Sequence, residues 1–264
     1  MSIFRDSDAC KGLSVGKDNI SVRGDTLQVR GLFVDYISDC VKLREPKTLD
    51  TAHNPDLETM SRIVSERFSP TDRYTTERTL TWSEAWLRVL VANMRVEGAV
   101  KDRRNVVFLP RNRGHSKFWT NNLFDMNGAA IRESLPNMDP IYSSMFAETM
   151  RDMVWSHNSM FLTEQGYIGI AKGGCTDYRV CAEYNPTLRF DPEHPDVKHS
   201  IFIVAGGNTP FVLRETKPSS EEDGGVGTPT YKLVGPCYLH GFMEGEHTYE
   251  LLRQAGRLTT IHIV

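Results

Sequence analysis

The chain has 264 residues, 39% of them hydrophobic and 25% charged, which is ordinary for a soluble globular protein with one sizeable core or two small ones. A net charge of -3 and a pI near 6.3 do not indicate a surface for nucleic acid, and the basic run at residues 101–104 is short. No run approaches the roughly 20 apolar residues that span a bilayer. We therefore expect a cytoplasmic protein with neither a membrane span nor a nucleic-acid partner.

The five cysteines are odd in number, and no two of them have the C-x-x-C spacing of a zinc ribbon. Neither a disulfide framework nor a structural zinc site is indicated, so reduced thiols are expected. The cysteines are Cys10, Cys40, Cys175, Cys181 and Cys237.

The first half of the chain predicts a strand followed by a helix. Residues 1–26 form a polar N-terminal segment, and residues 27–37 are rich in β-formers, with Gly31 marking a bulge or turn. Thr81 and Glu84 have capping-box spacing at the start of a helical pattern. Its apolar members are Trp82, Ala85, Trp86, Val89, Leu90 and Met94.

The second half changes from helical to β-type patterns. A second helical pattern covers residues 142–154, and short β-type runs then follow between glycine and proline turns. Two stretches poor in apolar residues, 185–199 and 215–229, are predicted to be inserted surface loops. The predicted strands are residues 160–170, 178–184, 200–205, 210–214 and 230–243.

Together these elements predict a single α+β domain over residues 1–264. Its antiparallel, partly barrel-like C-terminal sheet should pack against two or more helices from the middle of the chain. No internal repeat suggests a solenoid or a propeller.

The standard catalytic motifs are either absent from the sequence or lie in surroundings that do not suit them. Gly12-Leu-Ser14-Val-Gly16 matches the nucleophile-elbow pattern, but it lies in a polar segment rather than between a buried strand and a helix. Neither a Walker A nor a dinucleotide-binding motif occurs. Four crowded side chains meet no known metal-ligand spacing, and a turn with capping carboxylates is favoured: His240, Glu244, Glu246 and His247. We expect no cofactor and no metal.

Several other side chains allow two interpretations. The chain's 4 Trp, 10 Met and 9 Tyr could line an adaptable apolar cavity, although ordinary core packing is favoured for any one of them. Arg214 closes an apolar strand, where its guanidinium could hold a protein carboxylate or a polar ligand group. Cys237 has no evident base beside it and is interpreted as a small core residue.

Three blocks in the second half resemble one protein family when taken in order and spacing. They are Met160-Phe-Leu-Thr-Glu-Gln-Gly-Tyr-Ile-Gly169, Thr209-Pro-Phe-Val-Leu-Arg214 and Tyr231-Lys-Leu-Val-Gly-Pro-Cys-Tyr-Leu-His-Gly-Phe-Met-Glu-Gly-Glu246. They resemble the region that follows the death-triggering domain in fungal heterokaryon-incompatibility (HET) proteins. Residues 27–37 and 86–91 are also similar to family elements, so the resemblance touches about half of the chain.

The chain departs from the family pattern in two turns and at its start. Ile170-Ala171 stands where the family usually has Gly-Pro, and His199-Ser200 stands where it has Gly-Asp. The chain begins at about the point where the HET domain itself would have ended, so the death-triggering activity is not expected.

The resemblance implies a role in fungal secondary metabolism. Short HET-like proteins resemble factors of natural-product biosynthesis, where some relatives act as cofactor-free cyclases, including catalysts of [4+2] (Diels–Alder) cycloadditions. We expect a cyclase of lyase or isomerase type that holds a hydrophobic terpenoid or polyketide intermediate in an apolar pocket. The candidate catalytic residues are Tyr167, Arg214, Tyr238 and His240, and the candidate substrate-binding residues are Trp82, Trp86, Trp155, Phe211, Phe242 and Met243.

Two other functions stay open. The chain could be a non-catalytic recognition module, derived from an incompatibility protein, that binds a protein partner through its C-terminal sheet. A hydrolase that uses Ser14 is the third and least favoured hypothesis. Taken singly, each candidate catalytic residue also has a purely structural interpretation.

Overall fold

The computed structural model describes residues 8–13, 16, 19–43, 55–69, 72–75, 82, 85, 89, 94–96, 106–108, 158–172, 198–216 and 229–264. The predicted helix over 142–154, the predicted strand over 178–184 and most of both predicted insertions lie outside these residues. Ser14, Trp86 and Trp155 also lie outside them.

The described elements are mostly strands. In chain order they are β1 (Ile20–Arg23), β2 (Thr26–Lys42), α1 (Pro55–Arg67), β3 (Met94–Val96), β4 (Val106–Phe108), β5 (Asn158–Thr163), β6 (Ile168–Lys172), β7 (His199–Val204), β8 (Pro210–Thr216), β9 (Thr230–Leu239), α6 (Thr248–Ala255) and β10 (Thr259–Ile263). The predicted α+β class, with a mostly antiparallel sheet, is confirmed at this level.

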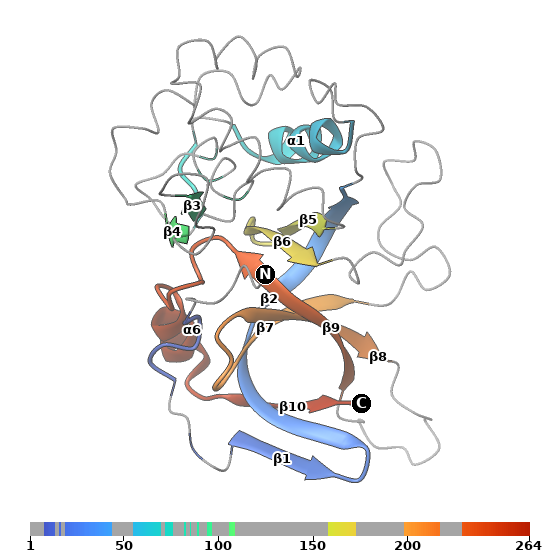
Figure 1. Cartoon of the computed structure of the whole chain (residues 1–264), viewed down its shortest axis with the longest axis vertical. Coiled ribbons are helices and arrows are strands. Elements are labelled where there is room, and N and C mark those ends of the chain that lie inside the picture. Colours follow the sequence, from blue (N-terminus) through green and yellow to red (C-terminus); the bar gives the residue numbers. More distant parts are fainter. Residues whose placement is uncertain are drawn as a thin grey trace.

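The strand pairings return on themselves and form a barrel-like ring, visible in the lower half of Figure 1. β2 pairs with β7, β7 with β8, and β8 with β9, all antiparallel. β10 closes the ring by pairing antiparallel with β2 and, over only two residue pairs, parallel with β9. A second path runs from β2 through β5 and β6 to β9, so β2 and β9 belong to both halves of the sheet.

The length of β2 allows this double pairing. Its 17 residues pass through Gly31, which neither ends nor turns the strand. A Cβ on Gly31 would lie 2.7 Å from the carbonyl oxygen of Ile203, so glycine permits the close approach of β7. Register shifts between Phe33 and Asp35, and between Ile37 and Asp39, let β2 change from one partner to another.

The core has two apolar clusters because β7 is buried on both faces. One cluster fills the ring, and the other lies between the ring, β5, β6 and α6. The first contains Val29, Phe202, Leu213 and Ile261. The second contains, among others, Leu32, Val34, Phe161, Ile201, Val212, Cys237, Leu239 and Phe242. Ala9, Cys10 and Leu13 join the second cluster, so part of the segment predicted to be polar is buried.

The helices differ in part from those expected. α1 packs on β2 and β5 above the ring, whereas α6 lies beside the ring near the carboxyl end rather than in the middle of the chain. Trp82, Ala85 and Val89 are helical and buried, as their spacing predicted. Met94 is not part of that helix, because it pairs with Phe108 in the β3–β4 ribbon.

Two further expectations concern thiols and membranes. Cys10, Cys40 and Cys237 form no disulfide in the described part of the chain, and Cys237 is a buried core residue as predicted. Neither helix in the described part of the chain is long and apolar enough to cross a bilayer.

Gly169 on β6 marks the tightest packing of the second sheet path. A Cβ there would collide with the Phe161 ring and with the carbonyl oxygen of Tyr238. We expect Gly169→Ala to lower the free energy of unfolding by about 1–3 kcal/mol, because backbone cannot move aside as a flexible side chain can. Urea unfolding measures the loss. Gly16→Ala is the matched control, since no atom of the described residues lies within 4 Å of the added carbon, its chain neighbours aside. Equal stability of the two variants would contradict the prediction.

Candidate functional site

Tyr238 and His240 form a buried polar pair at the end of β9. The Tyr238 hydroxyl lies 2.8 Å from His240 Nδ1, and the two residues are 2% exposed. They project to the same face because side chains alternate along a strand, and the backbone N–H of His240 extends the pairing by donating to the Ile168 carbonyl. The sequence predicted both residues as catalytic candidates, and the fold brings these two together.

The direction of this hydrogen bond has a chemical consequence. A neutral imidazole nitrogen is a stronger acceptor than a phenol oxygen, so we assign the phenol as donor and Nδ1 as acceptor. The imidazole proton then lies on Nε2. His240 therefore has an N–H donor whose direction is set by Tyr238.

A row of three aromatic rings begins next to His240. The Tyr74 ring lies 5.1 Å from the His240 ring, measured between centroids, and meets Trp82 edge to face at 4.9 Å. Phe68 stacks on Trp82 with centroids 4.0 Å apart. Such contacts exclude water, so a hydrogen bond in this place is stronger than the same bond in solvent.

Backbone hydrogen bonds hold these rings in place. Asp72 closes a turn after α1 by accepting the Ser69 N–H at 2.9 Å, and its carbonyl accepts the N–H of Trp82 at 3.0 Å. The Tyr74 hydroxyl accepts the N–H of Ile168, the first residue of β6, at 3.0 Å. Tyr74 thus ties the covering segment to the same strands that carry the Tyr238–His240 pair.

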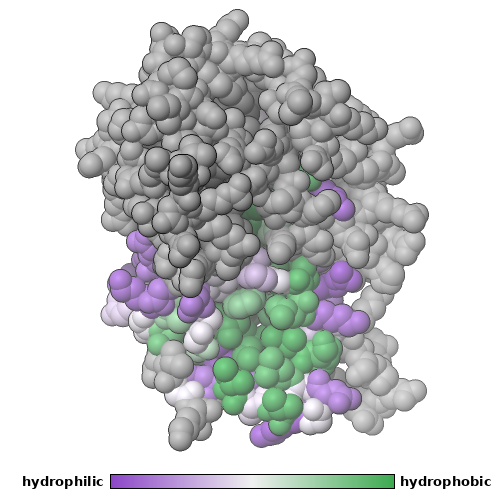
Figure 2. Space-filling model, viewed as in Figure 1, coloured by the Kyte–Doolittle hydropathy of each residue, from purple (hydrophilic) through white to green (hydrophobic). Residues whose placement is uncertain are grey.

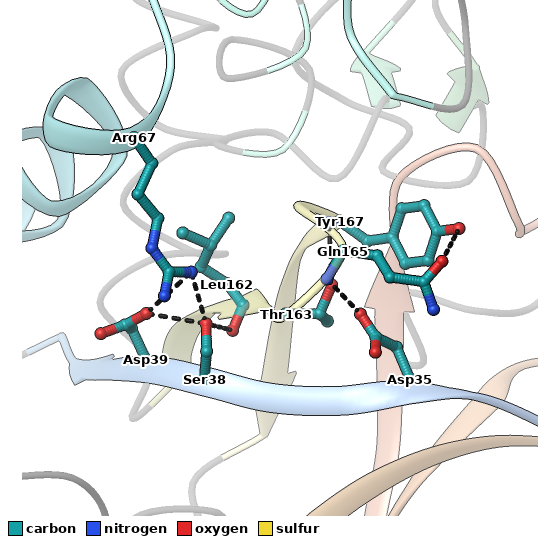
Figure 3. Close-up of polar contacts among 8 residues, drawn as sticks. All are labelled: Asp35, Ser38, Asp39, Arg67, Leu162, Thr163, Gln165 and Tyr167. Atoms are coloured by element: carbon teal, nitrogen blue, oxygen red, sulfur yellow. Dashed lines mark hydrogen bonds and ion pairs between the residues drawn. The ribbon is translucent and has the colours of Figure 1, made fainter.

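Tyr167 belongs to a different set of contacts, at the turn between β5 and β6 (Figure 3). Its hydroxyl donates to Gln165 Oε1 at 3.2 Å, and its N–H donates to Thr163 Oγ1 at 2.8 Å. The buried Asp35 carboxylate accepts the N–H of Gln165 at 2.8 Å. The Tyr167 ring packs edge to face on Phe242, so Tyr167 supports the turn and the core below it.

A second polar group in Figure 3 joins α1 to β2. Arg67, in the last turn of the helix, donates to Ser38 Oγ at 2.8 Å and forms an ion pair with Asp39 at 3.3 Å. Ser38 in turn donates to the Leu162 carbonyl on β5. These contacts fix the end of α1 that precedes Phe68 and Asp72.

The phenol of Tyr167 makes the free energy of unfolding depend on pH in the alkaline range. Burial raises the pKa of its phenol, and the Asp35 and Glu250 carboxylates raise it further. Below about pH 10 the phenol keeps its proton in both the folded and the unfolded chain. The neutral, buried Tyr167 side chain then makes its full contribution to the free energy of unfolding. As the pH rises towards the folded-state pKa, the unfolded chain releases the proton first, and the folded state loses stability.

We therefore expect Tyr167→Phe to show a smaller fall in unfolding free energy between about pH 9 and pH 11 than the unsubstituted protein. Urea unfolding at several pH values measures this difference. Tyr249→Phe, at a side chain that is 70% exposed on α6, is the control. A fall of the same size in the Tyr167→Phe protein would contradict the assignment.

The remaining predicted residues are spread over several places. Arg214 pairs in register with His199 and Lys232 on the β7–β8–β9 sheet, away from Tyr238 and His240. Phe211 packs against the cluster inside the ring. Phe242 and Met243 are buried in the turn after β9, where Met243 Sδ lies 3.4 Å from the Leu239 nitrogen. Of the predicted substrate-binding residues, Trp82 is thus joined to the Tyr238–His240 pair through Tyr74.

The crowded carboxylates after β9 act as the turn interpretation predicted. Glu246 accepts the N–H of Glu244 at 3.0 Å, and both residues are exposed, whereas His240 is buried with Tyr238. The described residues contain no group of three or more His, Cys, Asp and Glu side chains placed to hold a metal ion.

Sequence reasoning missed Tyr74, which connects Trp82 to His240. Tyr74 stands alone in a polar stretch, so no periodicity distinguished it. The available signal was the combination of Pro70 and Asp72 before it, which predicts a turn that could return the chain to the sheet.

The chain was compared with known proteins at three levels. No protein-family model matches it, and neither a curated protein nor a solved structure does so. The resemblance to HET proteins therefore stays a prediction.

Proposed function

We propose that the protein is a cofactor-independent cyclase that binds a hydrophobic terpenoid or polyketide intermediate and promotes its intramolecular cyclisation, including [4+2] cycloaddition, in the cytoplasm of a fungus. The resemblance to the tails of HET proteins supplies the reaction class. The observation that carries the proposal is the buried Tyr238–His240 hydrogen bond next to the Tyr74 ring, which in turn packs on Trp82.

The chemistry needs two contributions, and these residues are suited to both. Aromatic walls hold a flexible substrate in its reactive conformation, an effect that can be worth several kcal/mol. His240 Nε2–H donates to a carbonyl oxygen that gains negative charge in the transition state, and Tyr238 holds the imidazole in the required tautomer. Neither step requires a nucleophile or a change of oxidation state.

Product analysis tests the proposal. The purified protein is added to, or withheld from, extracts of a fungal host that expresses a pathway producing linear polyketide or terpenoid intermediates. A new isomer of unchanged mass, seen by chromatography and mass spectrometry and absent with heat-denatured protein, would support a cyclase. Identical profiles in an extract with verified intermediates would overturn it.

A second candidate function is favoured by the surface of the ring. Apolar side chains gather on the visible face of the ring strands (Figure 2). Leu233 on β9 is 53% exposed, and Val264 after β10 is 50% exposed. Such a patch suits a non-catalytic module that recognises a protein partner. Identical product profiles would make this the leading function.

A further inference from the structure

The inside of the ring contains side chains from all five of its strands. Val29 of β2, Phe202 of β7, Leu213 of β8 and Ile261 of β10 form one buried cluster, and Tyr231 of β9 packs against it. Side chains from every strand of a ring can meet in this way only when they point inward. The ring is therefore filled, and its exposed ends are where a ligand would meet it.

One end of this interior is lined by aromatic rings. Phe202 meets Phe33 edge to face at 5.6 Å and Tyr231 at 5.3 Å, and Phe33 lies 4.8 Å from Tyr36. Phe33 is 38% exposed, whereas Phe202 is 3% exposed. The four rings thus lead from the surface into the interior and offer faces and edges on which another flat ring can pack.

Ser200 is a polar residue within these apolar surroundings. It is opposite Tyr36 on β2 and Leu213 on β8 in register, and Phe202 is two residues further along the same face of β7. Ser200 is 1% exposed, and its hydroxyl has no hydrogen-bond partner in the described part of the chain. A buried hydroxyl without a hydrogen-bond partner lowers the stability of the fold. Packing alone therefore does not explain why a serine occupies this position.

The rim of this end carries two opposite charges. The N–H of Glu215 donates to the Lys198 carbonyl, which brings these residues together, and Lys198 Nζ lies 4.7 Å from the centre of the Tyr36 ring. Glu215 is opposite Tyr231 in register. Burial raises the pKa of Tyr231, and Glu215 and then Tyr36 raise it further, so this phenol stays neutral. Within the described part of the rim, the formal charges of Lys198 and Glu215 cancel, which favours an uncharged ligand.

We propose that this end of the ring is a binding site for a neutral, flat aromatic group that carries one hydroxyl or carbonyl oxygen, which forms a hydrogen bond with Ser200. Phe33, Tyr36 and Tyr231 pack on the ligand ring. The site is separate from the Tyr238–His240 pair, because Tyr231 and Tyr238 lie about 23 Å apart along β9 at about 3.3 Å per residue. The inference does not depend on the proposed cyclase activity.

Two probes that share a methyl-substituted ring test the proposal: p-cresol, which has a hydroxyl group, and toluene, which lacks one. Their binding is followed by NMR of the protein labelled with ¹³C in its Phe and Tyr rings. We expect p-cresol to shift the signals of Phe33, Tyr36 and Tyr231. Ser200→Ala should weaken p-cresol binding about 5- to 10-fold and leave toluene binding unchanged.

Stability gives an independent readout of the same variant. Because Ser200→Ala removes an unsatisfied hydroxyl without adding volume, it should raise Tm by about 2–4 °C. Ser21→Ala is the matched control, at an exposed strand serine that bonds Gln28, and it should change neither measurement. The proposal is overturned if p-cresol leaves the three rings unshifted, or if Ser200→Ala binds p-cresol as tightly as the unsubstituted protein.

Discussion

Tyr238→Phe is expected to lower the rate of product formation by about 10- to 100-fold, less than the roughly 100- to 1,000-fold for removing a direct donor, because Tyr238 acts through His240. The substitution removes only the hydroxyl that lies 2.8 Å from His240 Nδ1. Nδ1 then loses the donor that favours the tautomer with the proton on Nε2. The rate is measured as the initial yield of the new isomer by mass spectrometry.

The same variant should also lose stability, since His240 Nδ1 is left without the Tyr238 hydroxyl in a buried place. We expect a loss of about 1–3 kcal/mol in unfolding free energy. Measuring the rate well below the unfolding temperature separates this loss from the chemical effect. Tyr249→Phe, the same change on an exposed side chain, should alter neither the rate nor the stability. If Tyr238→Phe leaves the rate unchanged, the pair has only a structural role.

Trp82→Ala is expected to lower the free energy of unfolding by about 3–5 kcal/mol, the range for truncating a large buried aromatic side chain. Trp82 is 1% exposed and contacts both Phe68 and Tyr74. Its loss opens a cavity beside Phe68 and Tyr74. Since domains are stable by only about 5–15 kcal/mol, the change should be visible in urea unfolding even at low temperature.

Trp82→Phe is the control for that experiment, because it keeps an aromatic ring that can stack on Phe68. Its cost should be less than half that of Trp82→Ala. If the alanine variant is as stable as the unsubstituted protein, Trp82 does not pack as the structure has it. If the phenylalanine and alanine variants lose the same amount, the indole N–H rather than the ring area accounts for the stability.

The local pattern of residues determined most of the elements. The β-type runs 200–205 and 210–214 predicted β7 and β8 with boundaries close to those observed, and the helical spacing of Trp82, Ala85 and Val89 was correct. These predictions succeed because side-chain periodicity reflects which face of an element is buried. The single run predicted over 160–170 is instead two strands, β5 and β6, joined by a turn, and β9 ends at Leu239 rather than at residue 243. The prediction that Met94 belongs to the helix was wrong, because Met94 pairs with β4 in a ribbon of three residues per strand.

Local pattern could not show which residues meet in space. Tyr238 and His240 are two residues apart on one strand, so the sequence alone could place them on one face. Tyr74 and Trp82 reach them only because the turn at Asp72 returns the chain over β6. Ser200 appeared to be an ordinary strand residue until β2 and β8 enclosed it.

The sequence by itself determined the α+β class, the composition of several strands and the candidacy of Tyr238 and His240. The tertiary structure decided that β2 serves two halves of the sheet, that β10 closes a ring, and that Tyr167 and Arg214 lie apart from that pair. The physical reason is the separation along the sequence of the residues that interact. Periodicity and turn chemistry depend on a few neighbouring residues, whereas ring closure and burial depend on contacts between segments far apart in the chain.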